Sequence, residues 1–373
     1  MNGACTTSKP QHIGIAGAGL LGRLLAWLLS REGHQVEVFD PAPDATTRGA
    51  AGWTAAGMLS PVAELECADL AVASLGWRSL DLWQFFVTQW PQDVYFKRLG
   101  SWLLAHSGDL GSAQRFLQVL QNKSESQFWP QPVNQAQLRA QEPSVVSGLH
   151  AWHVSDEGQI HTVQAMAAMA DAATRQGVTW HWGHTVSRLS AGHIDGRSFD
   201  HVFDVRGTGA RLPKGPASPT PSTSLIEQQV RGVRGEIFWL QTQEPMLTQP
   251  VRLMHPRWRV YLVPRPDNIL VVGASEIESD DRSPISVRTT LGLLSAAHSV
   301  LPDLAESRIV HSEVNLRPAL HDNLPRIEHE SGLTRINGLF RHGWLIAPAL
   351  VEQALSQAGL CSSLLPSPEP QAA

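Results

Sequence analysis

Apolar residues near the start of the chain follow two different periods in quick succession. Residues 13–16 and 36–40 form short apolar runs, and residues 20–31 between them repeat apolar positions at helical spacing. Gly33 follows the helical stretch, as is common just past a helix C-terminus. A strand, a helix and a strand within about thirty residues predict a βαβ unit with a parallel sheet.

The rest of the chain mixes helical and extended patterns. Helical spacing predicts helices over residues 74–89, 111–120, 162–177 and 286–301. Extended patterns predict two strands and a turn over residues 178–190, and single strands over residues 199–205, 235–240, 258–263 and 268–273. These elements favour the α/β fold class, with a Rossmann-like domain interleaved with a second domain built on a mixed or antiparallel sheet.

The length of the chain also favours two domains, because 373 residues exceed the size at which single cores stop growing. Residues 212–224 are rich in Pro, Ser and Thr, which indicates a surface loop. The expected division is residues 12–85, 150–225 and 312–362 for the first, discontinuous domain, residues 86–149 and 226–311 for the second, and residues 363–373 for a disordered tail.

Composition narrows the class of protein. A 42% hydrophobic and 17% charged chain is typical of a soluble globular protein, and its net charge of −5 argues against a broad nucleic-acid-binding surface. No run of 18 apolar residues predicts a membrane span, and three scattered cysteines suit a reducing compartment, so we expect a cytoplasmic protein. Neither the cysteines nor His150, His153 and His161 have the spacing of a metal site.

Three glycines follow the first predicted strand in the pattern GxGxxG. Gly17 permits a tight turn, Gly19 lets the backbone approach a pyrophosphate, and Gly22 allows the helix to pack closely on the strand. The helix N-terminus stabilises negative charge, and Asp40 at the end of the next strand can accept hydrogen bonds from a ribose. This context predicts a dinucleotide site, although the motif alone does not distinguish FAD from NAD.

Two further stretches indicate a binding role only when they are considered together with the GxGxxG motif. Residues 52–61, GWTAAGMLSP, are mostly small and could lie flat against a planar group, but a tight turn under the core would look the same. Residues 338–348, GLFRHGWLIAP, lead into an apolar helical segment. Alone, this stretch favours an ordinary helix start with Arg341 in solvent; next to a dinucleotide site it favours a role in binding.

Four more segments accompany these three motifs in a fixed order. They are VRGVRGE at residues 230–236, VYLVPR at 260–265, VVGASEIESDD at 271–281 and NLRPALHDNLPRI at 315–327. In this order the seven motifs resemble the D-amino-acid oxidase superfamily of FAD enzymes, and within it the glycine oxidase branch associated with thiamine biosynthesis. The resemblance covers residues 12 to 360.

The resemblance implies a D-amino-acid oxidase type of fold, in which the discontinuous domain binds FAD and the other holds substrate. It also implies noncovalent FAD, because sarcosine-type oxidases attach flavin through a cysteine near residues 315–327, where this chain has none. The residues expected to contact FAD are Gly17, Gly19, Leu20, Leu21, Gly22, Asp40, Ala55, Ala56, Gly57, Met58, Val186, Gly207, Leu339, Phe340, Arg341, His342, Gly343, Trp344 and Leu345.

The resemblance also implies which side chains face the substrate. Arg317 corresponds to an arginine that binds the substrate carboxylate, and a guanidinium can do so through two parallel charge-assisted hydrogen bonds. Tyr261 corresponds to a tyrosine that also reaches the carboxylate, and Arg341 faces the substrate. Arg259 lies on the same strand face as Tyr261, because side chains alternate along a strand. Trp344, if it lines the pocket, would favour small substrates.

The implied reaction is oxidative deamination of glycine, sarcosine or a small D-amino acid by hydride transfer to FAD. O2 would reoxidise the flavin and give H2O2, and the imine would hydrolyse or enter thiamine thiazole synthesis. A neutral amine needs no side-chain base, so we nominate none.

Three alternatives remain: a broader D-amino-acid oxidase or dehydrogenase, a flavoprotein that modifies a macromolecule such as tRNA, and a flavin-binding module without catalysis. The expected partners are a small amino acid and O2, without nucleic acid or membrane, and a homo-oligomer is possible by analogy.

Overall fold

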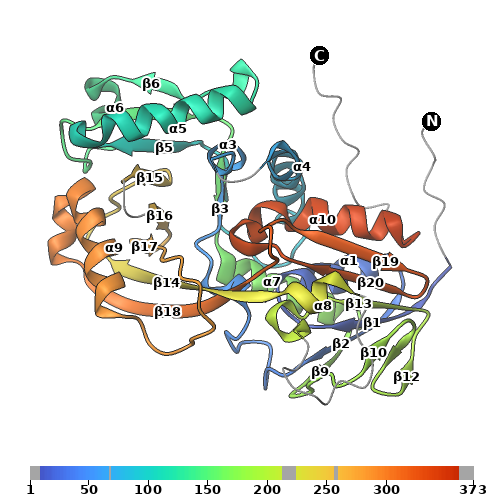
Figure 1. Ribbon diagram of the computed structural model, residues 1–373. Coiled ribbons are helices and arrows are strands. Elements are labelled where there is room, and N and C mark those ends of the chain that lie inside the picture. The colour runs from blue at the N-terminus through green and yellow to red at the C-terminus, as the bar shows by residue number, and fades with distance from the viewer. Residues whose placement is uncertain (1–8, 67–68, 212–223, 256–258, 361–373) are drawn as a thin grey trace.

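The computed structural model describes residues 9–66, 69–211, 224–255 and 259–360. Two large β-sheets form two lobes, joined by strands that run from one to the other (Figure 1). The three cysteines, most of the expected loop at residues 212–224 and the expected tail at residues 363–373 lie outside the described residues.

The first lobe contains a six-stranded sheet that is parallel except at one edge. Its order is β19 (Arg326–Glu330), β20 (Leu333–Asn337), β13 (His201–Asp204), β1 (His12–Ala16), β2 (Gln35–Asp40) and β9 (Thr179–Trp182). Only β19 runs antiparallel to its neighbour. Helix α1 (Leu20–Arg31) connects β1 to β2, which confirms the βαβ unit predicted from the sequence.

Alternate residues of β1 face two different layers of this lobe. Ile13 and Ile15 share a core with α1, α7 (Thr162–Arg175) and α10 (Gly343–Gln357). Ala16 belongs to a second core on the opposite face, under a small antiparallel sheet of β10 (Leu189–Ser190), β11 (His193–Ile194) and β12 (Arg197–Ser198). Every residue of α1 from Leu20 to Ser30 is buried, so this helix is an interior element fixed from all sides.

The second lobe contains an eight-stranded, mostly antiparallel sheet. Its order is β18 (Arg308–Ala319), β14 (Arg231–Gln241), β17 (Ile269–Gly273), β16 (Arg259–Arg265), β15 (Val251–Met254), β5 (Ser101–Ala105), β7 (His150–Val154) and β6 (Gln131–Val133). Side chains alternate along β5 as well. Leu104 packs in the core with α9 (Val287–Val300), whereas Leu103 packs in the core with α5 (Leu110–Lys123), so helices cover both faces.

A two-stranded antiparallel ribbon links the lobes. β14 and β18 pair from Arg231–Ala319 at one end to Gln241–Arg308 at the other, with one irregularity after Trp239. Figure 1 shows both strands reaching from the second lobe into the first. Side chains near the Arg231 end of this ribbon therefore lie between the two sheets.

The remaining elements complete the described chain. They are the sheet of β3 (Met58–Leu59), β8 (Gly158–Ile160) and β4 (Phe96–Lys97); the helices α2 (Ala51–Thr54), α3 (Pro61–Glu64), α4 (Leu70–Phe86), α6 (Gln135–Gln141) and α8 (Leu225–Gln229); and the 3-10 turns η1 (Ser107–Asp109), η2 (Ser126–Phe128), η3 (Gly207–Ala210), η4 (Pro302–Glu306) and η5 (Phe340–His342).

The predicted fold class is confirmed, and most predicted elements are present within a few residues. One difference has a clear cause. Helix α4 begins at Leu70 rather than at residue 74, because the Asp69 carboxylate accepts a hydrogen bond from Val72 N and caps the helix there. The strands β18, β19 and β20 were not predicted, since polar and charged residues interrupt them throughout.

The expected domain boundaries remain a prediction. The strand β7, at the start of the expected segment 150–225, and the whole of β18, which extends past residue 312, both belong to the eight-stranded sheet. A division by sheets would therefore place these two strands with the second domain. Within the described residues, no helix has the length and apolar character needed to cross a membrane.

Candidate active site

A cavity of about 690 Å3 runs between the two sheets, a volume typical of sites for cofactors and small ligands. At one end lie the glycine turn after β1 and the residues that follow β2. At the other lie side chains from β14, β15, β16 and β18, and η5. The predicted residues that line it are Gly17, Gly19, Leu20, Leu21, Asp40, Ala55, Ala56, Gly57, Met58, Val186, Gly207, Tyr261, Arg317, Leu339, Phe340, Arg341, Gly343 and Trp344.

Three predicted contact residues do not line this cavity. Gly22 packs against the turn below it, and Leu345 packs in the core, where its side chain fills the space next to Gly76. His342 is 3% exposed and points to the carboxylate of Glu64. The side chains of Leu345 and His342, and the packing at Gly22, therefore contact other parts of the protein instead of the cavity.

The glycine turn has the close packing that the motif requires. Gly17 has a φ of 104°, a value that favours glycine. A Cβ at Gly22 would lie 1.8 Å from the carbonyl oxygen of Gly17, so any larger residue would separate helix from strand. The N-terminus of α1 has no side-chain cap at Gly19, which leaves its backbone N–H groups available to an anion.

Asp40 does two things at the end of β2. Its carboxylate accepts hydrogen bonds from Ala18 N at 2.6 Å and from Ala42 N at 2.8 Å, and this ties the glycine turn to the chain after β2. A carboxylate has about four acceptor positions, so two bonds leave Asp40 able to accept from a ribose as well.

A buried arginine that was not predicted from the sequence also lies at the glycine-turn end of the cavity. Arg23 is 1% exposed and donates to the carbonyl oxygens of Ala18, Met166 and Ala45. Burial lowers its pKa to about 10, against the opposing effect of Asp40. Arg23 therefore remains a cation at neutral pH and lines the cavity close to the glycine turn. Arg23 follows Gly22 inside a mostly apolar helix. A charged residue at such a position could have indicated a buried cation from the sequence alone.

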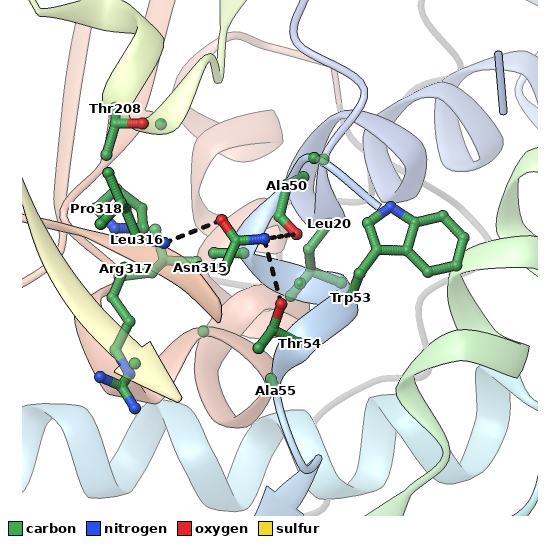
Figure 2. Close-up of a pocket in the computed structure, with 18 of the residues that line it drawn as sticks. Leu20, Ala50, Trp53, Thr54, Ala55, Thr208, Asn315, Leu316, Arg317 and Pro318 are labelled. Atoms are coloured by element: carbon green, nitrogen blue, oxygen red, sulfur yellow. Dashed lines mark hydrogen bonds between the residues drawn. The ribbon is translucent and has the colours of Figure 1, made fainter. Parts of the chain in front are cut away.

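Asn315 holds the loop of small residues against the ribbon. In Figure 2 its side-chain amide nitrogen donates to Ala50 O at 3.1 Å and to Thr54 Oγ1 at 3.2 Å, while its oxygen accepts from Leu316 N at 2.9 Å. Asn315 was missed as well. It is the first residue of the segment 315–327, but a single asparagine in a sequence does not indicate which backbone groups its side chain will bind.

The next part of that loop is fixed from behind. Arg265 donates to Ala56 O and to Gln159 Oε1, and Thr162 Oγ1 donates to Ala55 O. A Cβ at Gly57, whose φ is 70°, would lie 2.1 Å from Ile160 O. The loop is thus pressed between β8 and the cavity, with only small side chains on the cavity side at Ala55 and Ala56.

Arg317 and Tyr261 meet at the far end of the cavity, and two glycines make room for them. A Cβ at Gly235 would lie 2.6 Å from the Arg317 guanidinium carbon, and one at Gly273 would lie 2.6 Å from the Tyr261 hydroxyl oxygen. Burial raises the pKa of Tyr261, so the phenol is protonated at neutral pH. Burial lowers the pKa of Arg317, but a guanidinium starts from so high a pKa that it keeps its charge in proteins.

The Arg317 guanidinium has only neutral acceptors in the described part of the chain. Its Nη1 donates to Ser275 O at 3.0 Å and to Arg234 O at 3.4 Å, and no carboxylate of the described residues forms a salt bridge with it. A cation that is half-buried without an anionic partner is unfavourable unless a ligand supplies the opposite charge. This makes Arg317 the natural partner of an anionic ligand.

Arg341 has a different environment. Its Nε lies 3.0 Å from Glu64 Oε2, and its Nη1 lies 3.4 Å from Glu276 Oε2. Glu64 also lies 2.8 Å from Arg252 Nη2 and 3.1 Å from His342 Nδ1. Burial alone would raise the pKa of Glu64, but the charges of Arg341 and Arg252 and the contact with His342 hold it well below the usual range of a carboxyl group.

The exposed side of this network continues to Arg259. Its guanidinium lies 3.8 Å from Glu276 Oε2 and 3.7 Å from Glu66 Oε2. Arg259 and Tyr261 both line the cavity, as the strand alternation predicted. The sequence reading named Arg341 but none of the glutamates that surround it.

The chain before α10 approaches the cavity with strained backbone. Phe340 lines the cavity and has a φ of 48°, a left-handed conformation that is costly for a bulky residue and often marks functional sites. Helix α10 has no side-chain cap at its N-terminus, and a Cβ at Gly343 would meet no protein atom closer than 3.9 Å. Free N–H groups of this helix end are therefore available to negative charge beside the cavity.

Trp344 lines the cavity but is held by the protein core. It is 3% exposed, its Nε1 donates to Gly52 O at 2.9 Å, and its ring centroid lies 5.2 Å from that of Trp83. The indole therefore forms a fixed part of the wall rather than a mobile cover.

These features fit an extended dinucleotide with a planar group at one end. The glycine turn and the end of α1 offer N–H groups to a pyrophosphate, and Asp40 offers acceptors to a ribose. A backbone loop with small side chains faces the middle of the cavity, and a second helix N-terminus lies beside Arg317 and Tyr261.

Comparison with known proteins agrees with this geometry. Residues 12–354 match the family described as FAD dependent oxidoreductase (DAO). A Rhizobium etli protein assigned to thiamine biosynthesis as the oxidoreductase ThiO is 34% identical over 90% of this chain and 93% of its own length. The bifunctional protein ThiO/ThiG of Trichormus variabilis is 27% identical, and its match covers 91% of this chain but only 51% of that protein.

A solved structure shows the same fold. The crystal structure of glycine oxidase from Geobacillus kaustophilus superposes with a TM-score of 0.76 and 23% identity, over 94% of this chain and 95% of that one. The glycine turn, the cavity and these matches lead to one conclusion: the chain belongs to the D-amino-acid oxidase family of FAD dependent oxidoreductases.

Proposed function

We propose that the protein oxidises the C–N bond of a small amino acid, with glycine or sarcosine as the best candidates. The observation that carries the proposal is the Arg317 guanidinium, a half-buried cation in the cavity wall with no salt bridge to any described carboxylate. A substrate carboxylate would supply the missing anion through two charge-assisted hydrogen bonds.

FAD, when bound, accepts a hydride from the substrate α-carbon, and this is the chemistry that the side chains need not provide. The residues of the chain orient the substrate. Arg317 and the protonated Tyr261 would hold the carboxylate, which fixes the α-carbon relative to the loop of Ala55 and Ala56. The N–H groups at the start of α10 would stabilise negative charge that develops beside them.

The remaining steps balance without a side-chain base. The neutral amine loses a hydride from carbon and a proton from nitrogen and becomes an imine. Hydrolysis of the imine gives a 2-oxo acid together with ammonia from glycine or methylamine from sarcosine, and O2 takes the two electrons and two protons to form H2O2. The match to a relative assigned to thiamine biosynthesis supports a second fate, in which a glycine-derived imine enters thiazole synthesis.

The test is an anaerobic screen of flavin absorbance. The purified yellow protein is mixed with glycine, sarcosine and a panel of D- and L-amino acids. Rapid bleaching by glycine or sarcosine, with peroxide formed after air is admitted, is the expected result. Bleaching only by bulky D-amino acids, or reoxidation only by a quinone dye, would point to a broader oxidase or a dehydrogenase instead. Flavin found in the pellet after denaturation would contradict noncovalent binding.

A further inference from the structure

The cations at the substrate end of the cavity differ in whether their charge is already neutralised. Arg341 and Arg252 both line the cavity, and both contact the carboxylate of Glu64, at 3.0 and 2.8 Å. Arg317 lines the same cavity and contacts only carbonyl oxygens in the described residues. Of these three guanidinium groups, that of Arg317 is open to an anion, and those of Arg341 and Arg252 are paired with the protein's own carboxylate.

Glu64 is built firmly into this position. It is 9% exposed and ends α3, a short helix that begins with Pro61 directly after the loop of small residues. Its two oxygens meet side chains from different parts of the chain, since Arg252 belongs to β15 and Arg341 and His342 belong to η5. The carboxylate cannot turn away from one partner without losing another.

A second anionic group on a ligand would meet this carboxylate. To reach Arg341 or Arg252 it would have to displace Glu64 from its partners, or stay close to a like charge in a poorly solvated site. Both are unfavourable. A ligand with one carboxylate bound to Arg317 meets neither obstacle.

We propose that Glu64 is a specificity-determining residue that restricts the site to substrates with a single carboxylate, because it neutralises Arg341 and Arg252 inside the cavity. Glu64 acts through these arginines and so is a positioning residue rather than a catalytic one. The inference rests on the proposed function, since it assigns Arg317 to the substrate carboxylate and names the class of amino acid that the site accepts.

The experiment compares ligands with one and two carboxylates. Acetate and malonate are titrated into the FAD-loaded protein, and binding is followed by the change in flavin absorbance. The ratio of malonate affinity to acetate affinity is measured for wild type and Glu64→Gln. Glu64→Gln should raise this ratio about tenfold, the effect of one added charge-assisted hydrogen bond. Turnover of iminodiacetate relative to glycine should rise in the same direction.

Two further variants separate the proposal from a general loss of structure. Glu276→Gln removes a carboxylate that also contacts Arg341, at 3.4 Å, but leaves Glu64 in place, so its ratio should stay within about twofold of wild type. The double variant Glu64→Gln with Arg341→Gln removes both charges, and its ratio should fall back toward the wild-type value.

The outcomes are distinct. An unchanged ratio in a Glu64→Gln protein that keeps its flavin and its melting temperature overturns the proposal. If Glu64→Gln loses flavin, the double variant should regain it; failure to do so shows that Glu64 acts in folding and also overturns the proposal. The titration needs only bound flavin, so its result is independent of whether glycine bleaches the flavin, which is the test of the proposed function.

Discussion

The two ends of the cavity are held by different kinds of interaction. At the glycine-turn end, main-chain geometry decides the shape: Gly17 and Gly22 touch, and Asp40 binds backbone N–H groups. At the arginine end, charged side chains decide it, with Arg341 and Glu64 in an ion-pair network and Arg317 outside it. On the function proposed above, the first end would bind the cofactor, and the second would set which substrate can enter.

The largest expected effect is at the glycine-turn end. Gly22→Ala would place a methyl group 1.8 Å from Gly17 O, so helix α1 must move away from β1. We expect a loss of about 3 kcal/mol or more in the unfolding free energy and a protein that purifies without FAD. Urea unfolding and flavin absorbance measure the two effects.

Gly19→Ala is the matched control at the same turn. Its added methyl would lie 3.5 Å from Ala50 Cβ, an ordinary contact. We expect the apoprotein to lose about 1 kcal/mol or less, while FAD affinity still falls because the backbone can no longer approach a pyrophosphate. A Gly22→Ala protein that is as stable and as yellow as Gly19→Ala would show that this end does not depend on close backbone packing.

The next effect tests the division between the two arginines. Arg317→Ala removes a guanidinium that lines the cavity without a carboxylate partner among the described residues, and we expect the KM for glycine to rise about 100-fold, the cost of a lost charged interaction. Arg341→Ala should raise KM only about tenfold, because Glu64 and Glu276 already neutralise Arg341. Steady-state kinetics with glycine decides the order, and a larger effect for Arg341→Ala would reverse the assignment.

Acidification should test the arginine end, where Glu64 carries a pKa that its partners lower. The pKa of Glu64 is lowered in the folded protein, so its ionisation stabilises the fold above the unfolded pKa of about 4.3, and that stabilisation is lost as the pH falls through the folded pKa. The unfolding free energy of wild type should exceed that of Glu64→Gln by about 3 kcal/mol at neutral pH.

This difference should be constant from pH 8 to about pH 5 and shrink below about pH 4.3. Urea unfolding at a series of pH values measures it. A difference that already shrinks between pH 8 and 6 would mean that burial raises the pKa of Glu64 above its usual range and that the arginines beside it do not hold it ionised.

The smallest expected effect concerns Trp344, in the cavity wall between the glycine-turn end and the arginine end. Trp344→Phe removes the hydrogen bond to Gly52 O and should cost about 1 kcal/mol and weaken FAD binding, because Gly52 begins the stretch of small residues that faces the cavity. Trp83→Phe is the control. It removes a similar bond, from Trp83 Nε1 to Trp344 O, at a residue that does not line the cavity. Equal FAD dissociation constants for the two variants would exclude a role for Trp344 in holding the loop.

The same contrast explains what the sequence could reveal. Helix α1 was predicted with its observed bounds, and the glycine turn could be derived from spacing alone, because steric rules act between residues that are close in the chain. The family resemblance then located Arg317, Tyr261 and Arg341 in the cavity wall.

Other parts could not be read from the sequence. Glu64 lies 277 positions from Arg341, and Asn315 lies 265 positions from Ala50, so no local pattern relates them. Arg23 was visible only as a charge inside an apolar helix, a pattern that predicts burial of a cation but not the three carbonyl groups that bind it. The strand β18 was missed because an edge strand of a half-exposed ribbon needs no apolar alternation.

The ribbon of β14 and β18 also constrains how the molecule can be altered. Eleven register pairs connect its two strands, and Asn315 and Arg317 stand on the same strand two residues apart, one holding the loop of small residues and the other facing the substrate end. One lobe cannot be exchanged for that of another protein while the other lobe is kept, because the boundary between the lobes would divide β18. Altered selectivity has to come from individual side chains around the cavity, or from transplanting the whole ribbon together with the lobe it serves.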